Sequence, residues 1–179
     1  MSDGAGLDAL RARLLAARDA RQALIERCGD GRVAVLVVAA NVPGADKRLP
    51  GVERLVDAAA EAVRSALPDA ARAGGGEDAL GPYAIFTSAR PADAIKRAAV
   101  QIEEGLPSGR LLDIDVHAAD GRQVDRASLG LPPRRCLVCD EPAADCIRTS
   151  RHSPAEVASA WQKCCDSCTP TAASRKSAP

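Results

Sequence analysis

The sequence predicts a single domain of the α/β (α+β) class: one sheet of at least three strands flanked by helices, followed by a Cys-rich irregular C-terminal segment. Up to Gly121, helical periodicity alternates with short runs of β-branched residues. Beyond that point the periodicity stops, and six of the seven cysteines follow residue 135. Because 179 residues suffice for one full core, we expect a core over 1–121, a Cys/His-rich segment over 122–165 packed on the same domain, and a disordered tail over 166–179.

The first third of the chain predicts a helix, a buried strand and a second helix. Residues 7–27 place leucines at helical spacing and arginines on the opposite face. Residues 33–40 are continuously apolar, as in a strand covered on both faces. Proline and glycine in residues 41–47 enforce an irregular turn, and residues 51–67 predict a helix closed by Pro68.

The middle of the chain predicts two further strands around a third helix. The glycine-rich residues 71–78 are expected to form a flexible loop without regular structure. Residues 83–87 predict a strand, and Pro91 opens a helix that reaches about Glu104. Residues 111–117 predict another strand, with Leu112, Ile114 and Val116 on one face and Leu111, Asp113, Asp115 and His117 on the other. A last helix is expected from Pro154 to about Lys163, while the direction of the strands stays open.

Composition excludes several classes of function. The formal net charge is zero, which leaves no global basic field for nucleic acid or anionic lipid. Aromatic residues make up only 2%, too few for a base-stacking platform. No apolar run is long enough to cross a bilayer or to act as a signal peptide. We therefore expect a cytoplasmic protein without nucleic-acid or membrane partners.

The pair Asp113 and Asp115 is the first candidate site. Two residues apart on a strand, these carboxylates share one face at a separation of about 7 Å. Hard carboxylates that repel each other suit Mg²⁺ bound to substrate phosphates. Gly109 and Arg110 come directly before the strand and can contact a phosphate. The alternative is an exposed strand face with two solvated carboxylates.

Basic residues elsewhere are candidates for phosphate binding. Lys47 follows the Pro-Gly turn at the end of the buried strand, where α/β folds often bind ligands. Arg18 and Arg21 lie on the first helix. For all three, a solvated surface position is the alternative.

The Cys-rich segment predicts a metal site. Cys136, Cys139, Cys146 and His152 supply three thiolates and one imidazole, a closed tetrahedral set suited to structural Zn²⁺. Buried thiols without metal are the alternative, and His152 could instead be a general base. For Cys164, Cys165 and Cys168 we expect spare thiols near a frayed end.

Read together, these segments resemble the citrate lyase holo-acyl-carrier-protein synthases. The resemblance covers about Leu14 to His152 and keeps the order of the blocks. The blocks are LLAARDARQ (14–22), NVPGADK (41–47), GPYAIF (81–86), IEEGLPSGRLLDIDV (102–116), then Arg126, Leu129-Gly130 and RRCLVC (134–139) with Cys146, Arg148 and His152. Ser108 and Asp125 depart from the family pattern, as does the Cys-rich end past Trp161.

The resemblance implies a nucleotidyltransferase-type enzyme. It would transfer 2'-(5''-triphosphoribosyl)-3'-dephospho-CoA to a serine of the apo acyl carrier (gamma) subunit of citrate lyase and release pyrophosphate. The chemistry of this transfer, and not the resemblance, leads us to expect Mg²⁺ on Asp113 and Asp115. We also expect Arg110 and Lys47 on the triphosphate, assisted by Arg18 or Arg21, with Gly109 and Arg126 completing the substrate site. Two alternatives remain: the equivalent synthase for the malonate decarboxylase carrier protein, and a non-catalytic, zinc-stabilised protein-binding module.

Overall fold

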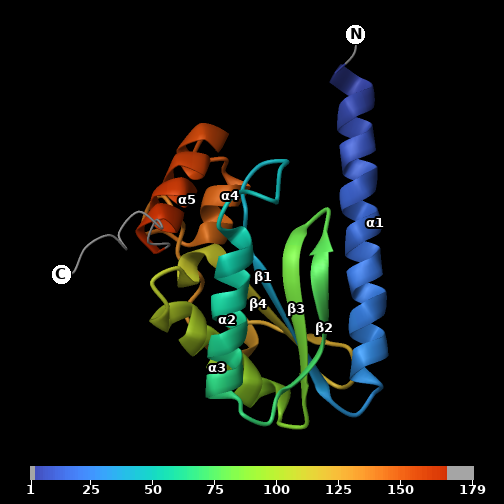
Figure 1. Ribbon diagram of the computed structural model, residues 1–179. Coiled ribbons are helices and arrows are strands. Elements are labelled where there is room, and N and C mark those ends of the chain that lie inside the picture. The colour runs from blue at the N-terminus through green and yellow to red at the C-terminus, as the bar shows by residue number, and fades with distance from the viewer. Residues whose placement is uncertain (1–2, 169–179) are drawn as a thin grey trace, which may run out of the picture.

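The computed structural model describes residues 3–168, which form one sheet with helices on both faces (Figure 1). The elements are, in order, α1 (Asp3–Gly29), β1 (Ala34–Ala40), α2 (Val52–Ala66), β2 (Ala71–Asp78), β3 (Gly81–Ser88), α3 (Ala92–Gly105), η1 (Gly109–Leu111), β4 (Leu112–His117), β5 (Gln123–Val124), η2 (Ala127–Leu129), α4 (Ala143–Arg148) and α5 (Pro154–Cys168); η1 and η2 are single 3₁₀ turns. This arrangement confirms the predicted class.

The sheet has five strands in the order β2-β3-β1-β4-β5, and every neighbouring pair is antiparallel. β1 therefore lies at the centre, as its continuous apolar run predicts. The antiparallel pairing answers the question of strand direction that the sequence left open.

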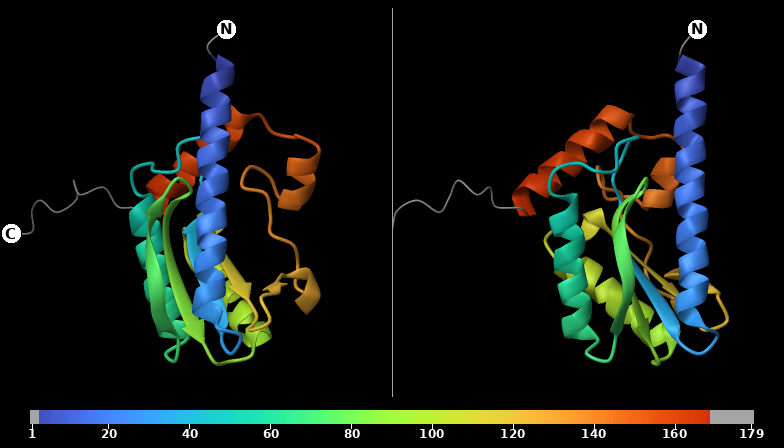
Figure 2. Two further views of the ribbon diagram at one scale, coloured as in Figure 1. Left: turned by 90° about the vertical axis from the view of Figure 1, so that its right-hand side faces the viewer. Right: turned by 45° about the vertical axis from the view of Figure 1, so that its right-hand side comes forward.

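The sheet is the middle of three layers. Leu36 and Val38 of β1 belong to the main core, which α2 and α3 cover. Val35 and Val37 point to the opposite face, where they pack with Ile25 of α1. Figure 2 shows α1 lying along this second face, with its N-terminal half extending beyond the sheet. One face of the sheet is thus densely covered, and the other is covered by a single helix.

β4 alternates between these two layers. Leu112, Ile114 and Val116 are buried in the main core, which leaves Asp113 and Asp115 on the α1 face as predicted. Leu111 does not share that face. It ends the 3₁₀ turn η1, before the strand pleat begins, and its side chain is fully buried in the main core.

The prediction of a loop at residues 71–78 is wrong. These residues form β2, an edge strand paired with β3, with an irregularity between Arg72 and Gly74. Gly75 and Gly76 have φ angles of 150° and 156°, which L side chains rarely adopt. The glycines therefore permit an irregular edge strand instead of preventing one.

The last helix is longer than the sequence predicts. α5 continues to Cys168, so residues 166–168 are helical, while 169–179 lie outside the described residues. Ser153 and Glu156 form a reciprocal capping box at its start. Trp161 and Cys165 bury their side chains in the main core, so Cys165 is a core residue and not a spare thiol. Among residues 3–168, no helix is both long and apolar enough to cross a membrane.

Candidate functional site

A cleft of about 360 Å³ lies on the α1 face of the sheet. Asp113 pairs with Ala39 across the strands, and the small side chain of Ala39 leaves space above β1 on this face. The cleft is lined by residues of α1, β1, the turn that follows β1, the β2–β3 turn, β4 and β5; these are Arg18, Arg21, Gln22, Ile25, Val37, Ala39, Ala40, Asn41, Val42, Lys47, Leu80, Asp113, Asp115, His117 and Gln123.

The two carboxylates of β4 lie together in this cleft. Gln123 Nε2 donates to Asp115 Oδ1 at 2.7 Å, and an Arg134 nitrogen lies 3.3 Å from Asp113 Oδ1. Desolvation and the charge of Asp115 raise the pKa of Asp113 to about 6, although the Arg134 charge acts in the opposite direction. Two carboxylates that disfavour each other's charge are suited to binding a cation.

The Pro-Gly turn brings Lys47 to the same cleft. Gly44 adopts a left-handed φ of 80°, and the Lys47 ammonium folds back to donate to the Val42 carbonyl. Burial lowers the pKa of Lys47. Gly81 packs against this turn so closely that a Cβ atom would lie 2.8 Å from the Lys47 carbonyl oxygen. The lysine therefore lies on a fixed backbone.

The two helix arginines differ in their surroundings. Arg21 binds both oxygens of Asp78 at 2.7 Å, and its guanidinium stacks 4.2 Å from the Tyr83 ring centroid. Its charge therefore fastens α1 to the β2–β3 hairpin. Arg18 is exposed and forms no ion pair with any residue that the structure describes.

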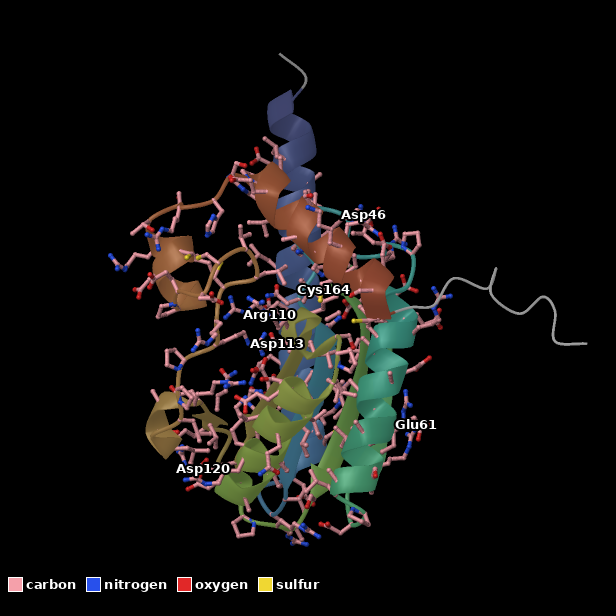
Figure 3. The ribbon with its side chains drawn as sticks, turned by 90° about the vertical axis from the view of Figure 1, so that its left-hand side faces the viewer. Asp46, Glu61, Arg110, Asp113, Asp120 and Cys164 are labelled. Atoms are coloured by element: carbon pink, nitrogen blue, oxygen red, sulfur yellow. The ribbon has the colours of Figure 1, made fainter. Side chains whose placement is uncertain are left out.

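Arg110 does not line the cleft. It is exposed at η1 and lines a second cavity of about 460 Å³, which we call the basic cavity. Its lining residues are Glu103, Glu104, Leu106, Pro107, Gly109, Arg110, Arg126, Pro132, Pro133, Arg134 and Arg135. Gly109 is required for close packing, since a Cβ there would lie 1.7 Å from the Glu103 carbonyl oxygen. Figure 3 shows Arg110 beside Cys164 of α5.

A buried polar network, which the sequence did not reveal, joins the basic cavity to Asp113. Glu103 is only 3% exposed and accepts from Arg126 at 2.7 Å, Arg134 at 2.7 Å and the Ile114 backbone N–H at 3.0 Å. Arg134 also donates to the Leu112 carbonyl at 2.8 Å. Glu103 follows buried Ala99 by four residues and so lies on the apolar face of α3. A carboxylate at such a position was the sequence signal for a buried, paired charge.

A third cavity of about 360 Å³ connects the first two. It shares Asp113, Asp115 and Gln123 with the cleft, and Arg126, Pro133 and Arg134 with the basic cavity. Because they share these residues, the three cavities adjoin one another from α1 past the two aspartates to η1, and together we call them the groove.

The predicted metal ligands come together at a separate place. One ligand atom from each of Cys136, Cys139, Cys146 and His152 lies within 4.8 Å of all the others. Cys139 Sγ lies 3.5 Å from Cys146 Sγ and 3.3 Å from His152 Nε2. A tetrahedron with Zn–S arms of 2.3 Å has S···S edges of about 3.8 Å. The cluster can therefore hold a metal ion.

Local backbone structure builds this cluster. The N–H of Val138 points to Cys136 Sγ at 3.4 Å, and α4 supplies Cys146. Arg135 and Pro142 form a small antiparallel bridge that closes the turn between the cysteines. His152 belongs to this cluster and lines neither the cleft nor the connecting cavity, so it is not placed to be the base beside the aspartates.

Known proteins resemble this chain. A family model described as apo-citrate lyase phosphoribosyl-dephospho-CoA transferase matches residues 10–168. Proteins of that name from Escherichia coli O9:H4 (strain HS) and Shigella boydii serotype 18 are 43% identical to the chain over 74 residues. A protein named probable apo-citrate lyase phosphoribosyl-dephospho-CoA transferase, from Escherichia coli K12 (MC4100 / BW2952), aligns to the same extent.

These pairwise alignments cover 41% of the chain and 40% of each relative, whereas the family model covers nearly the whole described range. The match confirms the resemblance that the ordered blocks indicated. The chain belongs to the family of apo-citrate lyase phosphoribosyl-dephospho-CoA transferases.

Proposed function

We propose that this protein transfers 2'-(5''-triphosphoribosyl)-3'-dephospho-CoA to a serine of the apo acyl carrier subunit of citrate lyase and releases pyrophosphate. The observation that carries the proposal is the cleft, whose lining brings the carboxylates Asp113 and Asp115 together with the cations Lys47 and Arg18. Family membership supports it, because the relatives are named as transferases of this group to apo-citrate lyase.

The reaction sets clear requirements. The serine oxygen attacks the α-phosphorus of the triphosphate, a new P–O bond forms, and the bond to the bridging oxygen breaks. Pyrophosphate takes the electron pair, and the serine loses its proton to a base. Because the enzyme forms no covalent bond to the substrate in this step, positioning and charge neutralisation provide the catalysis.

The residues of the cleft fit these requirements. Asp113 and Asp115 would hold Mg²⁺, which when bound neutralises charge on the phosphate oxygens. Lys47 and Arg18 approach from two other elements and would bind the β- and γ-phosphates. Arg134, 3.3 Å from Asp113, adds a cation on the side of the connecting cavity.

His117 is the residue that we assign as the general base. It lies two residues beyond Asp115 on the same face of β4 and lines the cleft. A neutral imidazole can accept a proton near neutral pH.

For the Cys/His cluster we propose a structural Zn²⁺ ion. Four ligands close the tetrahedron and leave no open position for chemistry. The segment around them has a small apolar interior, so metal binding would provide much of its order.

The test is a transfer assay with the purified protein, Mg²⁺, the triphosphoribosyl precursor and the apo carrier subunit. We expect the carrier mass to increase by the prosthetic group while pyrophosphate appears in equal amount. The Asp113→Asn and Asp115→Asn variants should each lose at least a hundredfold in rate, while Asp57→Asn, on the exposed face of α2, keeps full activity. The proposal would be refuted if folded wild-type protein produced neither modified carrier nor pyrophosphate.

The same assay separates the carrier proteins. Equal concentrations of the citrate lyase and malonate decarboxylase apo carriers compete for one pool of precursor. Preferential modification of the malonate decarboxylase carrier would reassign the partner and keep the chemistry.

A further inference from the structure

The basic cavity contains more positive charge than its own carboxylates neutralise. Four arginines and two glutamates line it. Arg126 and Arg134 bind Glu103, and Arg126 also binds Glu104 at 3.0 Å. The carboxylates of the cavity are therefore engaged by these two arginines.

The other two arginines, Arg110 and Arg135, form no ion pair with any residue between 3 and 168. Arg135 makes one hydrogen bond, to the Asp140 carbonyl at 3.3 Å, and both side chains are exposed. The cavity thus presents two guanidinium groups that have no carboxylate partner among the described residues. A ligand with about two negative charges would neutralise them.

The remaining lining is apolar and stiff. Leu106, Pro107, Pro132 and Pro133 supply it, and the proline rings restrict the backbone there. Such a lining suits a ligand that carries apolar or sugar parts on either side of its charge, and not a free inorganic ion.

The position of the cavity indicates which ligand this is. The connecting cavity joins it to the aspartate cleft through Asp113, Arg126 and Arg134. The precursor in the proposed reaction has two anionic parts: the triphosphate that reacts, and the diphosphate that links adenosine to pantetheine. A groove with one cationic site at each end matches a molecule with two such parts.

We infer that the basic cavity binds the diphosphate of the dephospho-CoA half of the substrate, through Arg110 and Arg135. This inference rests on the proposed function and deepens it. It also gives Arg110 a different task from the triphosphate contact that the sequence suggested, because Arg110 lines this cavity and not the cleft.

Calorimetric titration with dephospho-CoA tests the inference without turnover, because this ligand has the diphosphate and lacks the triphosphate. We expect Arg110→Gln and Arg135→Gln each to weaken binding by about fivefold to tenfold, and the double variant by about thirtyfold or more. Arg54→Gln, an exposed arginine of α2, is the matched control and should bind like wild type. Lys47→Gln should also leave dephospho-CoA affinity within twofold, because Lys47 lines the cleft.

Ligand fragments locate the contact. ADP should compete with dephospho-CoA, while adenosine, which has no phosphate, should not. The inference is overturned if wild type does not bind dephospho-CoA, if the double variant binds it within twofold of wild type, or if the double variant loses only affinity for the apo carrier protein. That last result would make the cavity a surface for an acidic protein.

The outcome is separable from that of the proposed function. Arginine-dependent binding of dephospho-CoA without any carrier modification would contradict the proposed transfer and leave the diphosphate site intact. Normal transfer with unchanged dephospho-CoA affinity in the double variant would contradict the diphosphate site and leave the proposed transfer intact.

Discussion

Replacing Glu103 by alanine is expected to destabilise the fold more than any change to an exposed carboxylate. The Glu103 side chain is 3% exposed and accepts hydrogen bonds from two guanidinium groups and one backbone N–H. Removing one partner of a buried ion pair costs about 3–5 kcal/mol. Because Arg126 and Arg134 retain some contact with water, at 16% and 28% exposure, we expect the low end, about 3 kcal/mol.

Glu103→Gln should cost less, about 1–2 kcal/mol. An amide oxygen in the place of Oε1 can still accept from Arg134 and from the Ile114 N–H, but the NH₂ group then faces the Arg126 donor, and the charge is lost. Arg134 would also lose the carboxylate that holds it 3.3 Å from Asp113, so transfer activity should fall in both variants.

The assay is urea unfolding followed by circular dichroism, with stability taken from the midpoint and an unchanged slope. Glu104→Gln is the matched control: this neighbour is 59% exposed, has one ion pair to Arg126, and should cost less than about 1 kcal/mol. The reasoning fails if Glu103→Ala lies within about 0.5 kcal/mol of wild type, or if Glu104→Gln costs as much.

Further predictions concern pH, metal, catalysis and backbone. Because the pKa of Asp113 is raised to about 6 in the native state, this carboxyl binds more protons there than in the unfolded chain between pH 4 and 6, and its contribution to stability falls as pH rises through that window. Asp113→Asn should therefore be more stable than wild type at pH 7 in EDTA, by about 1 kcal/mol since 48% of the side chain is exposed, and equal to it below pH 4; equal stability at both pH values would contradict this. Mass spectrometry should find one metal ion per chain. Chelation of this ion should shift the fluorescence of Trp161, the sole tryptophan, which packs α5 on the core. A folded, metal-free sample would exclude the site. His117→Asn should lower kcat by about a hundredfold in the transfer assay, and an unchanged kcat would assign the base elsewhere. Gly75→Ala should destabilise by about 1–2 kcal/mol in thermal unfolding, while Gly105→Ala, with no atom within 4 Å of its Cβ position, should be neutral.

Periodicity predicted most of the fold because the main elements bury their apolar residues at regular spacing. The alternation along β4 placed Leu112 and Ile114 in the core and Asp113 on the opposite face. The prediction failed at Gly74–Gly76, where composition indicates flexibility but pairing with β3 fixes the backbone. A single sequence contains no signal for the partner of an edge strand, so tertiary pairing decides the outcome.

The candidate site was predicted in part for the same kind of reason. Asp113 and Asp115 share a face because side chains alternate along a strand, so residues two positions apart lie on the same side. The position of Arg110 could not be inferred, because Arg110 lies within the 3₁₀ turn η1, outside the pleat of β4, and is found beside Cys164 of α5. Arg134 lies 21 residues beyond Asp113, and only the folding of a proline-rich segment around Glu103 brings them together.

The irregular backbone of β2 also affects the tendency of the molecule to aggregate in concentrated solution. The sheet ends at β2 on one side, where a regular strand would present a row of free N–H and C=O groups to another chain. The irregularity after Arg72 and the left-handed Gly75 and Gly76 interrupt that row, as bulges do at the edges of many natural sheets. At the opposite edge, β5 is only two residues long. Both borders of the sheet are therefore poor templates for edge-to-edge aggregation, and the glycine run has a consequence for association as well as for the fold.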